Sequence, residues 1–265
     1  MSESIIQMKE VNKWFGDFQV LKDINLEVKE KQKIVVCGPS GSGKSTLIRC
    51  INRLEEHQKG QIIVDGNELS EKTKDIEKIR AEVGMVFQQF NLFPHLSILD
   101  NCTLAPIWVK KTPKKQAEEF AMKQLEQVQI ADQATKFPGQ LSGGQQSRVS
   151  IARALITEPS LLLMDEPFAS LDAMTRQDLQ IDLLRLCMKR KTTVLFITHD
   201  ISEAVYLSDK IALMNSGEIQ QNFPIRIDKP RKNEIRYSAS FNNLCSDIHD
   251  CLKVYHGQTD EAKSK

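Results

Sequence analysis

The nine residues from Gly38 to Thr46 constrain this chain more than any other stretch. They read Gly-Pro-Ser-Gly-Ser-Gly-Lys-Ser-Thr and match the pattern G-x-x-x-x-G-K-[ST] without a mismatch. The pattern is informative only between a strand and a helix. A β-branched run at 33–37 precedes it, and apolar residues at helical spacing follow it between Ser45 and Leu54. We therefore predict a phosphate-binding loop between a buried strand and a helix.

The residue types in this loop suit a nucleotide. Glycines let consecutive backbone N–H groups surround an anion, and the helix that begins near Gly43 points its positive dipole end at the phosphates. Lys44 would add a full charge at the β- and γ-phosphates, and the Ser45 hydroxyl would bind Mg²⁺. The alternative is a flexible Gly/Ser turn without a ligand. The predicted nucleotide contacts are Gly38, Pro39, Ser40, Gly41, Ser42, Gly43, Lys44, Ser45 and Thr46.

Composition sets broad limits. The chain has 265 residues, and its 36 Lys and Arg nearly balance its 35 Asp and Glu. The net charge of +1 weakens any prediction of nucleic-acid binding. The six cysteines show no C-x-x-C pair, so we expect buried free thiols. We expect no signal peptide and no membrane span, so other chains would have to cross the membrane if this protein works there.

A second strand is predicted to end in two carboxylates. The apolar run at 160–164 leads directly into Asp165 and Glu166. Ligands of open α/β sheets lie at the carboxyl ends of parallel strands. Asp165 is therefore predicted to hold Mg²⁺ through water, and Glu166 to orient or deprotonate the attacking water. The alternative is an ordinary helix start with acidic residues in its first turn.

Two further residues are candidates by position. His199 follows a predicted strand at 192–197 and would share a sheet edge with Gly38 and Asp165, which favours a phosphate contact over a purely structural histidine. Phe15, expected on a turn with Trp14 and Gly16, either stacks on adenine or packs against the protein.

The middle and the end of the chain are predicted to be largely helical. Residues 97–155 form a helical block between strands, in which Ser142 caps a helix and the glycines beside it form a second anion site. The aromatic segment 90–95 either faces a partner or packs inward. After Phe223 we expect a polar extension that packs on the core, a helix at 235–252 and a frayed tail from Gly257.

With these motifs in order, residues 5–225 resemble the ATP-binding-cassette family, specifically the nucleotide-binding subunits of bacterial importers. The run Leu141-Ser142-Gly143-Gly144-Gln145 carries the resemblance more specifically than the phosphate-binding loop does. By the resemblance, Phe15 stacks on adenine, Gln88 touches Mg²⁺ and the attacking water, and His199 contacts the γ-phosphate. The resemblance also implies that a second group reaches the ATP of the partner copy: Ser142, Gly143, Gly144, Gln145 and Asp172.

The resemblance also implies a fold. It is an α/β P-loop NTPase with a RecA-like core, an N-terminal antiparallel β subdomain and an inserted helical subdomain. The expected bounds are 1–88 with 156–223 for the ATP-binding core, 89–155 for the helical subdomain and 224–265 for a C-terminal extension.

The implied partners follow from the family. Two copies would sandwich two ATP molecules and Mg²⁺, on two transmembrane permease subunits at the cytoplasmic face of the inner (plasma) membrane. A periplasmic or surface solute-binding protein would deliver the solute, and no nucleic acid would be bound. Ser147 and Ala169-Ser170 depart from common family patterns without removing a catalytic group.

The expected solute depends on a mosaic of resemblances. The first part of the chain, to about Leu155, resembles polar-amino-acid importers. Residues 171–204 and the tail at Pro230-Arg231 resemble the nitrate, sulfonate and taurine group. We expect a polar amino acid, with a taurine, sulfonate or nitrate importer as the alternative. Two functions outside transport compete with these: a soluble cassette ATPase acting on nucleic acid or ribosomes, and a P-loop kinase, in which the run at 141–145 has no place.

Overall fold

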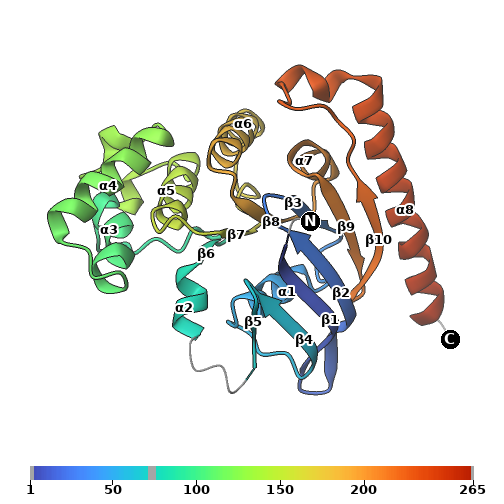
Figure 1. The fold of residues 1–265 in the computed structure, drawn as a ribbon. Helices are drawn as coiled ribbons and strands as arrows, with labels where there is room; N and C mark the ends of the chain where they lie inside the picture. The colour runs from blue at the N-terminus through green and yellow to red at the C-terminus, as the bar shows by residue number, and fades with distance from the viewer. Residues whose placement is uncertain (1–2, 71–75, 264–265) are drawn as a thin grey trace. The chain divides into compact units, whose positions relative to one another are not determined.

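The computed structural model describes residues 3–70 and 76–263 (Figure 1). Its contacts group the chain into two compact units. The first comprises Met1–Thr73 and Leu195–Lys265, and the second Lys74–Val194. The domain bounds expected from the family describe a different division and stay a prediction.

An antiparallel sheet at the start of the first unit confirms the predicted β subdomain. Its strand order is β2-β1-β4-β5. The strands are β1 (Ser4–Phe15), β2 (Phe18–Lys29), β4 (Lys59–Val64) and β5 (Asn67–Glu68). Buried Ile24, Leu26 and Val28 alternate with exposed neighbours along β2, the pattern of a strand with one covered face.

Turn chemistry in this sheet follows the sequence closely, with one correction. Asp65 and Gly66 join β4 to β5 with φ of 48° and 72°, as a two-residue hairpin turn requires. The prediction that Trp14 and Phe15 lie on a turn is wrong. Both belong to β1, where Phe15 pairs with Phe18, because two apolar aromatics extend the ladder up to the tight turn at Gly16.

The first unit also carries strands in the order β10-β9-β3-β8. They are β3 (Lys33–Cys37), β8 (Thr193–Thr198), β9 (Lys210–Asn215) and β10 (Glu218–Pro224). β3 pairs with β9 in parallel, and β10 pairs with β9 in antiparallel fashion. Every residue of β3 is buried, which explains its unbroken apolar run. Helix α1 (Lys44–Ile51) follows β3, and α7 (Ile201–Leu207) follows β8.

The C-terminal segment packs on the rest of the first unit. A short 3-10 helix, η3 (Asn233–Tyr237), precedes α8 (Ala239–Lys263), which packs against α7 and β9 and buries Phe241 and Ile248. The frayed tail predicted from Gly257 is wrong, because α8 continues to Lys263. The residues after Gly257 contain no proline and include good helix formers, so nothing in them stops the helix.

The second unit contains two parallel strands and most of the helices. β6 (Val83–Val86) and β7 (Leu161–Asp165) pair from Val83↔Leu161 to Val86↔Met164. The helices are α2 (Ile76–Ala81), α3 (Ile98–Trp108), α4 (Lys114–Gln127), α5 (Gly143–Leu155) and α6 (Ala173–Arg190). The helical block at 97–155 is confirmed, but it is interrupted between α4 and α5, where only η1 (Ala131–Gln133) and η2 (Pro138–Gln140) are helical.

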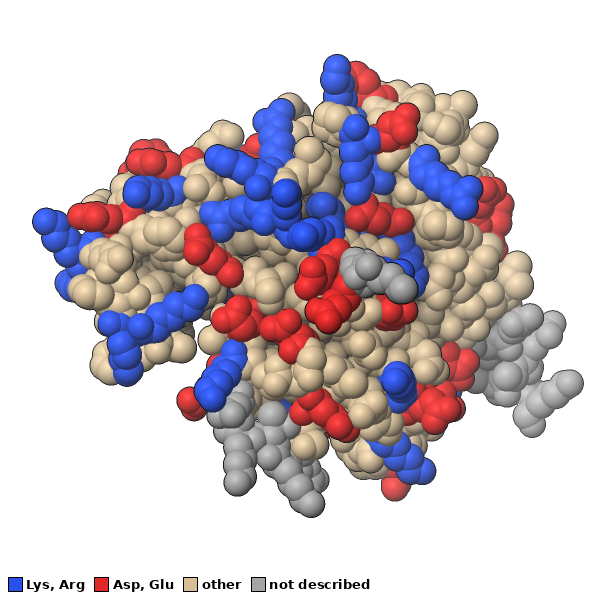
Figure 2. All heavy atoms as spheres, in the orientation of Figure 1, with Lys and Arg blue, Asp and Glu red and all other residues tan. Residues whose placement is uncertain are grey.

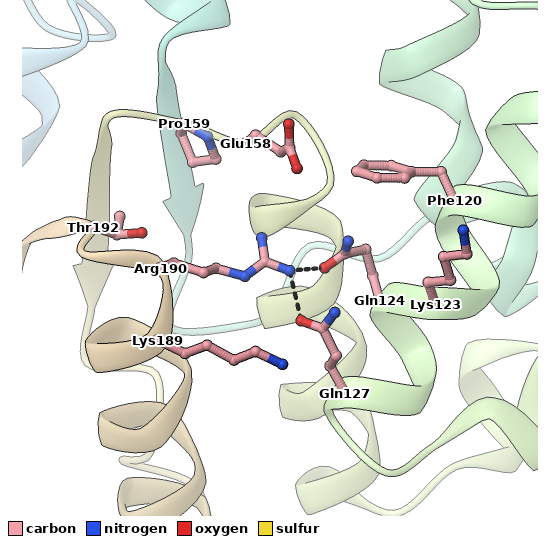
Figure 3. Close-up of a pocket in the computed structure, with 9 residues that line it drawn as sticks. All are labelled: Phe120, Lys123, Gln124, Gln127, Glu158, Pro159, Lys189, Arg190 and Thr192. Atoms are coloured by element: carbon pink, nitrogen blue, oxygen red, sulfur yellow. Dashed lines mark hydrogen bonds between the residues drawn. The ribbon is translucent and has the colours of Figure 1, made fainter.

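Arg190 joins two of these helices. It is the last residue of α6, and its Nη2 donates to the side-chain oxygens of Gln124 and Gln127 on α4, the latter at 2.7 Å (Figure 3). Its Nη1 donates to the carbonyl of Leu155 at 3.2 Å. Burial lowers the pKa of Arg190, and Glu158 opposes that effect. Arg190, Gln124 and Gln127 line a hollow of about 420 Å³. Because Arg190 bonds to α4 and α5 from the end of α6, this hollow is a structural junction of the three helices.

Other features of the described residues bear on the expectations from composition. All six cysteines are free thiols; four are buried, as predicted, and Cys245 and Cys251 are half-buried. Among the described residues no helix is both long enough and apolar enough to cross a membrane. Lys and Arg side chains are interspersed with Asp and Glu on the face drawn in Figure 2.

Candidate functional site

The phosphate-binding loop lies between β3 and α1, as predicted. Gly41 and Gly43 have φ of +77° and +96°, in the left-handed region that favours glycine. A Cβ on Gly38 would lie 2.0 Å from the carbonyl oxygen of Met214, so the backbone of the loop runs directly against β9. Glycine is therefore required at Gly41 and Gly43 by the backbone conformation, and at Gly38 by the close approach of β9.

Backbone contacts hold the loop in place, and they come from residues that the sequence did not assign to the site. The backbone N–H of Gly217 donates to the carbonyl of Ser42 (3.1 Å), and the N–H of Lys22 donates to the carbonyl of Gly217 (2.8 Å). A Cβ on Gly43 would lie 2.8 Å from the carbonyl oxygen of Val20. In the sequence, only the Ser216-Gly217 turn pointed to any of these residues, and such a turn by itself indicates a hairpin rather than support for the loop.

Side chains of the loop suit an anion. Lys44 is 4% exposed, and its Nζ donates to the carbonyls of Gly38 (2.9 Å) and Pro39 (2.8 Å), so its charge lies across the loop. The hydroxyl of Ser42 is buried and has no hydrogen-bond partner among the described residues. Burial raises the pKa of Cys37 to about 12 despite the nearby Lys44, so the residue just before the loop adds no negative charge. The donors and the cradle fit a phosphate group.

Two other predicted residues belong to the same unit. Phe15 is 47% exposed at the end of β1, and Nζ of Lys13 lies 4.5 Å from the centre of its ring. Lys13 also pairs with Glu55 at 3.4 Å. His199 is exposed directly after β8, and Asp200, the next residue, caps α7. The first unit thus holds the phosphate-binding loop, an exposed aromatic ring and His199.

The second unit holds the predicted acidic residues and Gln88. Asp165 is the last residue of β7 and is 2% exposed, and Glu166 follows it with φ of 45°. A non-glycine residue in that region is strained, which is common at functional sites. Gln88 is exposed two residues after β6. Because β6 and β7 are parallel neighbours in register, the structure brings Gln88 and the two carboxylates to the same sheet edge.

The run at 141–145 forms a capped helix start, as predicted. The Ser142 hydroxyl accepts the N–H of Gln145 (3.3 Å), and the Gln145 side chain accepts the N–H of Ser142 (2.9 Å). This reciprocal pair is a capping box. Ser142 and Gly143 are exposed, whereas a Cβ on Gly144 would lie 2.4 Å from the Thr175 methyl carbon. The N-terminus of α5 is therefore fixed against α6 and open to solvent at its first residues.

Asp172 lies beside this helix start. It caps α6 by accepting the N–H of Thr175 at 3.0 Å, and the Thr175 hydroxyl and backbone lower the pKa of the Asp172 carboxyl. Thr175 thus touches both Gly144 and Asp172, so the structure brings the predicted dimer-facing residues together.

Ser147, which departs from the family pattern, has a structural role. It is completely buried, and its hydroxyl donates to the carbonyl of Pro167 at 3.4 Å. This bond ties α5 to the segment that follows Glu166.

The aromatic segment 90–95 is fixed in two directions. Arg153 donates to the carbonyls of Phe90 (2.7 Å) and Asn91 (2.6 Å). Asn101, 1% exposed, accepts the N–H of Phe93 (2.8 Å) and donates to its carbonyl (3.1 Å). Phe90 is buried and Phe93 is 42% exposed, so one ring of this segment packs inward and the other faces outward.

A groove of about 880 Å³ runs beside that segment within the second unit. Its apolar wall includes Phe93 and Trp108, the latter 69% exposed. Its charged lining is mostly basic and comprises Arg80, Lys110, Lys111 and Arg153 against Glu77. The groove can therefore receive an amphipathic segment that carries an acidic residue.

Comparisons with known proteins bear on this geometry. Residues 21–169 match the model of a family described as "ABC transporter". The chain belongs to the ABC transporter family. It is an ATP-binding, ATP-hydrolysing subunit of that family, and the predicted family and fold class are confirmed.

Similar curated proteins are named for amino acids. "General L-amino acid transport ATP-binding protein AapP" of Rhizobium johnstonii is 54% identical over 224 residues, covering 84% of this chain and 87% of that protein. "Glutamate/glutamine/aspartate/asparagine transport ATP-binding protein BztD" of Rhodobacter capsulatus is 54% identical over 223 residues, covering 84% of each chain. "Glutamate/aspartate import ATP-binding protein GltL" of Escherichia coli is 47% identical over 220 residues, covering 83% of this chain and 91% of that protein.

Solved cassettes share the fold. The ATP-binding cassette MJ0796, described as a dimeric post-hydrolysis state bound to ADP and Pi, superposes with a TM-score of 0.76 at 34% identity, covering 84% of this chain and all of that one. CbiO1 of Clostridium perfringens is described as part of the ABC transporter complex cbiONQ. It superposes with a TM-score of 0.77 at 28% identity, covering 84% of this chain and 90% of that one.

Proposed function

We propose that this ABC subunit hydrolyses ATP to power the import of a polar amino acid. The observation that carries the choice of solute is the 54% identity, over 84% of this chain, to proteins named for general L-amino acid and for glutamate, glutamine, aspartate and asparagine transport. The alignments also cover most of both relatives, 87% of AapP and 84% of BztD.

For the nucleotide, we propose that the residues predicted from the sequence serve one ATP. The backbone N–H groups from Gly38 to Thr46 and the charge of Lys44 bind the phosphates, and Phe15 stacks on adenine. Ser45, Gln88 and Asp165 would hold Mg²⁺, which would neutralise charge on the phosphate oxygens. The buried Ser42 hydroxyl, without a partner among the described residues, and the Lys44 ammonium bound to the loop carbonyls support a phosphate in this cradle.

The chemical step is assigned to two further residues. Glu166 accepts a proton from the attacking water, and its place directly after Asp165 at the carboxyl end of β7 supports that role. His199 contacts the γ-phosphate and so favours the in-line geometry of attack. Its exposure directly after a buried strand supports that role.

A second copy of the chain completes the site. We propose that the N–H groups behind Ser142, together with Gly143, Gly144, Gln145 and Asp172, reach the ATP bound by the other copy. The open, capped start of α5 supports this role because its dipole favours a negative phosphate. MJ0796, a dimer by its description, has the same fold.

The remaining partners would be membrane and solute-binding subunits. We propose that the basic groove between α2, α3 and α5 receives a short amphipathic segment of a permease subunit, since an acidic residue in that segment would face Arg80, Lys111 and Arg153. Two such permease subunits would hold the ATPase dimer at the cytoplasmic face of the membrane, and a periplasmic or surface solute-binding protein would bring the amino acid.

The experiment is co-purification of the tagged chain from membranes of its own cell, with partners identified by mass. We expect two permease subunits and a solute-binding protein, and the latter should bind glutamate or glutamine in a calorimetric titration. Binding of taurine or nitrate instead of amino acids would overturn the solute. Recovery with ribosomes or nucleic acid, and without membrane subunits, would overturn the importer.

A further inference from the structure

Helix α7 directly follows His199 and is buried along most of its length. Oδ1 of Asp200, the residue after His199, accepts the N–H of Glu203 at 3.0 Å, and the N–H of Asp200 donates to the Thr198 hydroxyl at 3.0 Å. His199 thus stands between the last residue of β8 and the cap of α7. A shift or rotation of α7 must therefore move His199.

The carboxyl end of α7 is held by the C-terminal segment. Nη1 of Arg231, a residue only 8% exposed, donates to the carbonyls of Val205 (3.1 Å) and Tyr206 (2.7 Å). The Tyr206 hydroxyl donates in return to the carbonyl of Arg231 at 3.3 Å. A cation on the last carbonyls of a helix satisfies groups that have no partner within the helix and opposes its dipole.

Arg236 contacts the same helix from its side. Its guanidinium carbon lies 3.6 Å from the centre of the Tyr206 ring, and its Nε donates to the Asn233 side chain at 3.1 Å. Tyr206 is completely buried, so the stack is desolvated on one side, where cation–π contacts are strongest. Burial lowers the pKa of Arg236, and Tyr206, Asp200 and Glu203 oppose that effect. Arg236 therefore interacts with both the cap and the last turn of α7.

We propose that Arg236 is a positioning residue for His199, and that the segment from Arg231 to Arg236 braces α7 so that His199 is presented to the phosphate. The inference rests on the role proposed for His199 above. Helix α8 extends the brace, since it packs on α7 and its Cys245 lies close enough to Asp200 and Arg236 for both to act on the pKa of its thiol, which burial raises to about 11. The C-terminal segment thereby contributes to hydrolysis without touching nucleotide.

The test is a double-mutant cycle on ATP hydrolysis by the full chain in its transporter complex. Arg236→Ala should lower kcat about 3- to 10-fold while KM for ATP and the affinity for a fluorescent ATP analogue stay unchanged. Arg236→Lys, which keeps the charge but not the planar group, should recover part of the loss. Arg236→Met replaces the alanine variant if that variant does not fold, and Lys253→Ala, on the exposed face of α8, is the matched loss of charge.

The deciding comparison uses a His199→Ala background. If Arg236 acts through His199, Arg236→Ala should have no further effect on the residual hydrolysis there. An equal fold-loss in both backgrounds, or an unchanged kcat in the single variant, would overturn the brace and leave the role of His199 intact. Full hydrolysis by His199→Ala alone would instead overturn the role of His199, and the brace with it.

Discussion

Two glycines of the phosphate-binding loop show how differently one residue type is used at neighbouring positions. A methyl group on Gly38 would meet the Met214 carbonyl at 2.0 Å, and that atom belongs to a paired strand that cannot move aside easily. A methyl group on Gly41 would meet nothing within 4 Å, but the residue has φ of +77°. Steric exclusion acts at the first glycine and backbone conformation at the second.

Stability measurements should separate these two causes. Gly38→Ala should lower the free energy of unfolding by at least about 2 kcal/mol, because strand and loop must separate. Gly41→Ala should cost only about 1 kcal/mol, the strain of a left-handed alanine. Urea unfolding of the purified variants measures both values. A smaller loss for Gly38→Ala than for Gly41→Ala would contradict the close packing of the loop on β9.

At the scale of elements, α8 shows how a polar, weakly patterned sequence becomes an ordered helix. Ile248 is completely buried where α8 packs on the rest of the first unit, whereas Val254, six residues later, is 59% exposed. The two positions are similar in chemistry and differ in burial. Both residues are β-branched and lower helix propensity to a similar degree. A difference between their substitutions therefore reports on the docking of α8 and not on its helix propensity.

This difference predicts a matched pair of effects. Ile248→Ala should destabilise the chain by about 2–4 kcal/mol through lost burial and a residual cavity. Val254→Ala should change stability by less than about 0.5 kcal/mol. Thermal and urea unfolding, read by circular dichroism, provide the comparison. Equal effects at the two positions would mean that α8 does not dock on α7 and β9 in solution.

At the scale of the whole molecule, the exposed helix start at Ser142 predicts association that depends on ATP. Glu166→Gln removes the proposed proton acceptor but keeps its size, so ATP should stay bound and hold two copies together. Light scattering after gel filtration should show a dimer of this variant with ATP and Mg²⁺ and a monomer without ATP.

A paired variant supplies the control for that association. Adding Lys44→Ala to Glu166→Gln should abolish the dimer, because the phosphates lose their main cation. Undiminished ATP turnover by the Glu166→Gln chain would exclude Glu166 as the proton acceptor. A dimer that forms equally well without ATP would show that the contact does not depend on a shared nucleotide.

Much of this molecule follows from short stretches of its sequence. The loop from Gly38 to Thr46, the strand that ends at Asp165, the cap at Ser142 and the Asp65-Gly66 turn are all as predicted. Each of these elements has a local signal within a few residues: a backbone hydrogen bond, a steric limit on φ or an unbroken apolar run.

Other parts depended on contacts between residues distant in the chain. The support of Ser42 by Gly217, the stacking of Arg236 on Tyr206 and the burial of Ser147 against Pro167 join positions separated by twenty residues or more. A single arginine or glycine in a polar stretch is compatible with many neighbours, and its local pattern does not say which. Folding selects those neighbours by packing the whole core at once, so these contacts could be found only in three dimensions.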